Sequence, residues 1–154
     1  TEDGELLTEN TAVLQYVADH LPQARLAPSD GFQRARMQQW LGFVGTELHK
    51  GIFIPLLDSK APADAKRYAR DKVSLRFSHL NNYLASREYL LDAFSIADAY
   101  LVTILNWTRA TDIDLKQWPA VNSYFQKQLT RPSVAKAFAE EVALYKEEQA
   151  RKAS

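Results

Sequence analysis

The chain has 154 residues, which is enough for one domain with a sizeable core, or for one domain and part of another. Lysine plus arginine balances aspartate plus glutamate at 19 each, and no basic stripe stands out, so the composition argues against a nucleic-acid-binding protein. The absence of cysteine excludes disulfides and thiolate metal sites. Because no apolar stretch is long enough to span a bilayer and no leader-like segment opens the chain, we expect a cytoplasmic protein with no metal and no membrane contact.

Residues 1–22 are predicted to form a turn, a short strand and a helix. The pair Asp3-Gly4 is a strong turn signal, and the strand that follows it as far as Thr8 has no partner nearby. Helix-capping residues then precede apolar side chains at helical spacing, namely Ala12, Val13, Tyr16 and Val17. A disordered tail is the alternative, but a strand followed closely by a helix favours the remnant of an α/β unit.

Residues 23–30 are predicted to be a linker, and residues 31–154 a helical domain. The longest helix is expected from about Phe32 to Leu57, with an apolar stripe made of Met37, Trp40, Leu41, Val44, Leu48 and Ile52. Gly42 and Gly45 lie on another face of this helix. Because a mid-helix glycine costs roughly 1 kcal/mol relative to alanine, the pair predicts that a neighbour packs very close there.

A helix-start signal marks the middle of the helical domain. Ser95 can accept a hydrogen bond from the Asp98 amide while the Asp98 carboxylate reaches back to the Ser95 amide, so both residues are assigned a structural role. The helix behind this cap, Ile96 to Trp107, carries few polar residues and therefore belongs in the centre of a bundle. Other helices are predicted from Pro62 or Asp64 through Leu84, from Pro119 to about Leu129, and after Arg131, where Val134, Phe138 and Val142 are expected inward.

Three segments resemble the glutathione transferase family. The segment from Tyr89 to Leu101, with its Ser-x-x-Asp helix start, resembles the helix-start motif of the family's C-terminal domain. The segment from Leu6 to Tyr16 resembles the last strand and last helix of its thioredoxin-like domain, and Glu47-Leu48-His49-Lys50-Gly51 is similar to the bacterial, beta-class branch. The resemblance covers essentially the whole chain. It implies a mainly α fold: an all-helical glutathione transferase C-terminal bundle preceded by the end of a thioredoxin-like α/β domain.

The resemblance implies an enzyme that conjugates the thiol of glutathione to small hydrophobic electrophiles in detoxification, and that assembles as a homodimer. The catalytic cysteine of the beta class would lie before Thr1, so we expect this chain to be a truncated and inactive form. The alternative is a non-catalytic helical interaction module of the same superfamily. The joint presence of Glu9, Glu47, His49 and Lys50 argues against that alternative, because a scaffold has no need for this set.

By the same resemblance, Glu9 and Asn10 bind the γ-glutamyl end of glutathione. The ammonium of that end needs a carboxylate partner, and its carboxylate suits the N–H groups at a helix start. His49 and Lys50 are expected to face the thiol as catalytic residues, since a cationic or hydrogen-bonding group favours the thiolate over the thiol. Glu47 is expected to reach the glutathione bound by the partner subunit.

Two aromatic residues, Phe53 and Trp107, are candidates to line the pocket for the electrophile. Each functional assignment has a structural alternative. Glu9 and Asn10 can serve only as a helix cap. His49 can fill a contact between the helix and a domain, and Lys50 can be a solvated charge. For the two aromatic residues the alternative is packing in the core.

Overall fold

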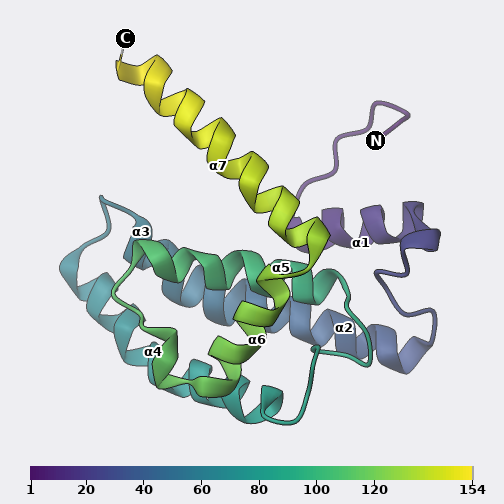
Figure 1. Cartoon of the computed structure of the whole chain (residues 1–154), viewed down its shortest axis with the longest axis horizontal. Helices are drawn as coiled ribbons and strands as arrows, with labels where there is room; N and C mark the ends of the chain where they lie inside the picture. The colour runs from purple at the N-terminus through teal and green to yellow at the C-terminus, as the bar shows by residue number, and fades with distance from the viewer. Residues whose placement is uncertain (154) are drawn as a thin grey trace.

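The structure, a computed structural model, describes residues 1–153, and it is built from helices (Figure 1). The predicted mainly α fold is confirmed, and no strand occurs within residues 1–153. In chain order the α-helices are α1 (Asn10–His20), α2 (Gly31–Phe43), α3 (Ile54–Leu57), α4 (Ala63–Leu84), α5 (Ile96–Asn106), α6 (Pro119–Leu129) and α7 (Pro132–Ala153). A π-helix, η2 (Val44–Phe53), joins α2 to α3, and short 3₁₀ turns are η1 (Pro22–Ala24), η3 (Trp107–Ala110) and η4 (Leu115–Gln117).

The segment before α1 differs from the prediction. The turn closes at Gly4, whose N–H donates to the Thr1 carbonyl at 3.0 Å and whose φ is 81°, as the Asp-Gly signal indicates. The residues after it do not form the predicted strand, and Leu6 is 88% exposed. A strand needs backbone partners on a second strand, and the described part of the chain offers none.

The predicted long helix exists, but it changes type along its length. α2 runs without a break into η2, whose hydrogen bonds span one residue more than those of an α-helix, and then into α3. All members of the predicted apolar stripe are buried: Met37, Trp40, Leu41, Val44, Leu48 and Ile52. Gly45 faces Tyr100 of α5, as the prediction of a close neighbour requires, whereas Gly42 is exposed and a Cβ at its position would have no neighbour within 4 Å.

The centre of the bundle is α5, which packs against α1, α2, η2 and α6. Its predicted cap is formed: the Ser95 N–H donates to Asp98 Oδ2 at 2.9 Å, and the Ser95 hydroxyl accepts from the Ala97 N–H at 3.3 Å. The fully buried Asp98 also accepts from the Leu90 N–H and from the Tyr124 hydroxyl. These bonds tie the loop before α5 and helix α6 to the start of the central helix.

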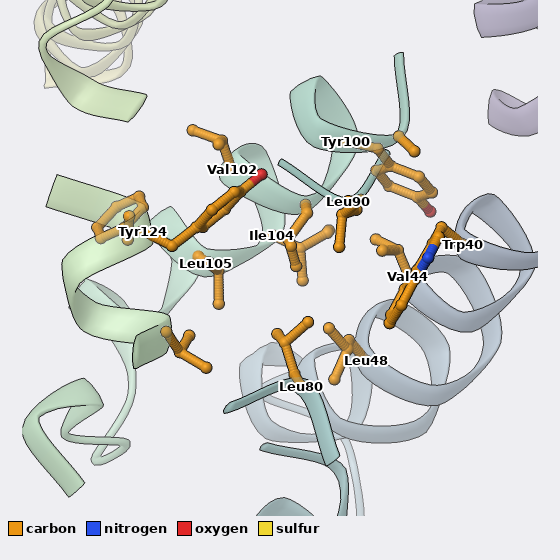
Figure 2. Packing of buried hydrophobic residues seen from close by; sticks show 14 of the residues in the cluster. Trp40, Val44, Leu48, Leu80, Leu90, Tyr100, Val102, Ile104, Leu105 and Tyr124 are labelled. Carbon is orange, nitrogen blue, oxygen red and sulfur yellow. The ribbon is translucent and has the colours of Figure 1, made fainter. Parts of the chain in front are cut away.

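The hydrophobic core lies between α5 and the helices around it (Figure 2). Val44 and Leu48 of η2 and Leu80 of α4 pack with Ile104 and Leu105 of α5, and all five are buried. Each fully buried aliphatic side chain contributes roughly 1.5–3 kcal/mol to stability. Two tyrosines, one from α5 and one from α6, lie toward opposite edges of this cluster in Figure 2.

Helix α7 begins at Pro132 on the bundle and projects away from it (Figure 1). Val134 and Phe138 pack against the core, but Val142 is 52% exposed, so its predicted inward position is wrong. The cause is the length of the helix, which extends past the surface on which its first turns rest. Within residues 1–153, every helix is too short or too polar to cross a membrane.

Candidate active site

One pocket gathers side chains from several separate elements. It has a volume of about 360 Å³ and is lined by Asn10 and Leu14 of α1, His49 of η2, Ala99, Tyr100, Thr103 and Ile104 of α5, and Trp107 of η3. Three residues predicted from the sequence, Asn10, His49 and Trp107, therefore come together. A larger pocket of about 490 Å³ lies along the linker, but of the predicted site residues it includes only Ser95, which already serves as the cap of α5. The smaller pocket is the candidate site.

His49 is held on two sides. Its Nδ1 lies 2.6 Å from the Tyr100 hydroxyl oxygen, and its ring meets Trp107 edge-on, with ring centroids 4.9 Å apart. Burial, followed by the nearby positive charge of Lys50, lowers the pKa of His49 below its ordinary value. The imidazole is therefore neutral at neutral pH and presents one donor nitrogen and one acceptor nitrogen.

The start of α1 also lines the pocket, through Asn10. Glu9 has φ 68° and ψ 115°, an uncommon conformation for a non-glycine residue, and its carbonyl accepts from the Ala12 and Val13 N–H groups. The Glu9 side chain is exposed and makes no capping bond, so capping does not explain its presence. Asn10, the next residue, lines the pocket together with Tyr100.

Tyr100 is the site residue that sequence reasoning misses. In the sequence it is only one member of the family-like helix start and of an apolar central helix. The available signal is its hydroxyl, because a buried tyrosine oxygen ordinarily finds a hydrogen-bond partner. Tyr100 is 6% exposed, and its hydroxyl oxygen lies 2.6 Å from His49 Nδ1 of η2.

The charged residues flanking His49 face other directions. Lys50 is exposed, as expected of a solvated charge, and its positive charge lowers the pKa of His49. Glu47 pairs with Arg76 of α4, with 2.6 Å between Oε2 and Nη2, and its Oε1 accepts from the Thr46 hydroxyl at 3.2 Å. The Glu47 carboxylate, predicted to reach a partner subunit, is thus held by an arginine of its own chain.

The two predicted aromatic residues differ in depth. Trp107 lines the pocket. Phe53 has no exposed surface and packs behind Trp107 and against Phe77, with ring centroids 6.2 and 6.5 Å away. The assignment of Phe53 to the electrophile pocket is therefore corrected to core packing, because its ring has no exposed surface and lies outside the pocket lining. Across residues 1–153 no group of three or more histidine or carboxylate side chains is arranged to hold a metal ion.

Comparison with known proteins agrees with the helical fold. A family model described as the glutathione S-transferase C-terminal domain matches residues 43–132. Glutathione S-transferase GstA of Escherichia coli O157:H7 is 35% identical over 142 residues, which cover 91% of this chain and 70% of GstA. A sphingomonad glutathione S-transferase solved with glutathione has a TM-score of 0.84 and 39% identity, covering 92% of this chain and 71% of its own. The beta-class enzyme of Sphingomonas chungbukensis has a TM-score of 0.85 and 38% identity over the same shares. On this evidence the chain belongs to the glutathione S-transferase family.

Proposed function

We propose that this chain carries the helical-domain side of a site that conjugates glutathione to small hydrophobic electrophiles. The observation that carries the proposal is the pocket lined jointly by Asn10, His49 and Trp107. The complex of the sphingomonad relative with glutathione supports the choice of substrate. In this proposal the apolar wall of the pocket, which includes Trp107, receives the electrophile.

The γ-glutamyl end of glutathione is assigned to the start of α1. The exposed Glu9 carboxylate is suited to pair with the ammonium group, because it is not engaged in capping the helix. The carboxylate of the same end suits the N–H groups of the first turn of α1, where the helix dipole is positive. Asn10 contributes its backbone position as the first residue of α1.

The sulfur of glutathione is assigned to the space next to His49. In the reaction the sulfur lone pair forms a bond to the electrophilic carbon, the thiol proton passes to solvent, and the leaving group departs with its bonding electrons. A neutral imidazole can donate one hydrogen bond to the thiolate, and the positive charge of Lys50 favours the same charged form. Both effects lower the pKa of the bound thiol and so raise the fraction that is nucleophilic at neutral pH.

We also propose a division of the chain into domains. Residues 1–22 belong with a thioredoxin-like domain, residues 23–30 are the linker and residues 31–154 are the helical domain of a cytoplasmic, homodimeric enzyme. Glu47 reaches a partner subunit only by exchanging its bond with Arg76. Because the chain has no cysteine to activate the thiol, we expect the 154 residues alone to bind glutathione weakly and to conjugate it slowly or not at all.

Titration with glutathione tests this proposal. The chain has three histidines, so the imidazole NMR signals of His49 can be followed beside those of His20 and His79. We expect glutathione to shift only His49, and Glu9→Gln to raise the apparent Kd by roughly tenfold, the value of one hydrogen bond between charged groups. The matched control is Glu5→Gln, another exposed glutamate in the same segment.

Conjugation is measured with 1-chloro-2,4-dinitrobenzene as the electrophile, with wild type and His49→Ala compared under identical conditions. Binding that shifts His49 and responds to Glu9→Gln supports the proposed site even where turnover is slow. If millimolar glutathione leaves His49 unshifted and no conjugate forms, the proposal fails and the alternative of a non-catalytic helical module is the better description.

A further inference from the structure

The Tyr100 hydroxyl meets one side chain of the candidate site at hydrogen-bond distance. Its oxygen is 2.6 Å from His49 Nδ1 of η2, and Asn10 of α1 lines the same pocket. Thr11 and the backbone of η2 at Gly45 close over it, since a Cβ at Gly45 would lie 3.6 Å from the hydroxyl oxygen and 4.0 Å from the Thr11 methyl. With 6% of Tyr100 exposed, few other partners can reach this oxygen.

The bond has a direction. A phenol has one proton to donate, and burial raises the pKa of Tyr100 and so keeps that proton on the oxygen. His49 Nδ1, 2.6 Å away, is an acceptor within reach of this proton. If Nδ1 carried a proton of its own, it would donate to the phenol oxygen and could not accept from it, and the buried phenol proton would lose this acceptor. The hydroxyl therefore donates to Nδ1.

This direction selects one form of the histidine. Nδ1 accepts a hydrogen bond only when it carries no proton, so the proton of a neutral imidazole must then be on Nε2. Nε2 forms no hydrogen bond to the described residues. The charged groups around the ring do not compete for Nδ1, because Lys50 is exposed and Glu47 is paired with Arg76.

We propose that Tyr100 is a positioning residue that holds His49 as the Nε2–H tautomer and thereby aims one hydrogen-bond donor at the glutathione sulfur. The statement that Nε2–H is aimed at the glutathione sulfur rests on the function proposed above. The tautomer of His49 is a property of this chain and does not depend on that function. Tyr100 acts through His49 and does not itself touch the substrate in this proposal.

NMR of the chain with ¹⁵N-labelled histidine tests the tautomer without glutathione. We expect the nitrogen shifts of His49 at neutral pH to report Nε2–H, with a slowly exchanging hydroxyl proton coupled to Nδ1. In Tyr100→Phe that coupled proton disappears and the ratio of Nε2–H to Nδ1–H falls by about fivefold, the value of one ordinary hydrogen bond. The matched control is Tyr83→Phe, which removes a hydroxyl bonded to the Leu90 carbonyl and leaves the His49 signals unchanged.

A measurement on the unsubstituted protein protects the test from a folding failure. The nitrogen shifts of His49 in the wild-type chain distinguish Nε2–H from Nδ1–H whether or not Tyr100→Phe folds. An Nδ1–H signal for His49 in the wild-type chain, or the same tautomer ratio in wild type and in a folded Tyr100→Phe chain, would overturn the proposal. Failure of glutathione to shift His49 while the tautomer is as expected would reject the proposed function and leave the tautomer assignment standing.

Discussion

Replacing Asp98 by asparagine tests how the central helix is attached to the rest of the bundle. The buried carboxylate accepts four hydrogen bonds: Oδ1 from the Leu90 N–H and the Tyr124 hydroxyl, both at 2.9 Å, and Oδ2 from the Ser95 N–H at 2.9 Å and the Ser95 hydroxyl at 3.0 Å. Asparagine keeps the shape of the side chain but places an NH₂ group where one of these oxygens was.

The magnitude follows from the donors that remain. Whichever oxygen is replaced, one backbone N–H is left facing another donor inside the protein, and a buried donor without a partner costs about 1–3 kcal/mol. The hydroxyl on the same side can turn and accept from the new NH₂ group, which offsets part of the loss. We therefore expect Asp98→Asn to lower the free energy of unfolding by about 2 kcal/mol, against a total of roughly 5–15 kcal/mol for a typical domain.

Urea unfolding followed by tryptophan fluorescence measures this difference. With a slope of about 1–3 kcal/mol per molar urea, the midpoint should fall by roughly 1 M while the slope stays constant. Asp71→Asn on the exposed surface of α4 is the matched control and should stay within about 0.5 kcal/mol of wild type. An Asp98→Asn protein as stable as that control would refute the reasoning that the four bonds are needed to stabilise the buried side chain.

Three further predictions concern glycines of α2 and η2 and the pocket. Gly51→Ala places a Cβ 2.9 Å from the Thr46 carbonyl oxygen and should destabilise the protein by about 1–3 kcal/mol. The Cβ of Gly42→Ala meets no atom within 4 Å, so this substitution should stabilise the protein by up to about 1 kcal/mol. Urea unfolding measures both differences. Folding lowers the pKa of His49, so as the pH falls the unfolded chain binds a proton at this residue before the folded chain does. The stability that His49 contributes is therefore present above its unfolded pKa of about 6.5. It is lost as the pH falls from that value to the lower folded pKa. A wild-type chain and a His49→Gln chain that lose the same stability over this interval would contradict that account. Lys50→Gln removes a positive charge beside His49 and should raise its pKa in an NMR titration, and a fall would show that the charge acts in the opposite sense.

Much of the fold can be predicted from the sequence because helices are specified by neighbours three or four residues apart. The buried stripe from Met37 to Ile52 and the cap at Ser95 and Asp98 are patterns of this kind, and both are present in the structure. The strand before Thr8 is predicted from an equally local pattern but does not form, because a strand needs a partner that a local pattern cannot supply.

The candidate site can be predicted only in part, for the same physical reason. Local spacing is enough to assign Asn10 to the start of one helix, His49 to a long helix and Trp107 to the end of the central one. Only the packing of the helices shows that these three residues share a pocket. The same packing places Phe53 in the core and pairs Glu47 with Arg76. The bond between His49 and Tyr100 joins residues 51 positions apart, and such a contact depends on how helices cross and not on spacing within either one.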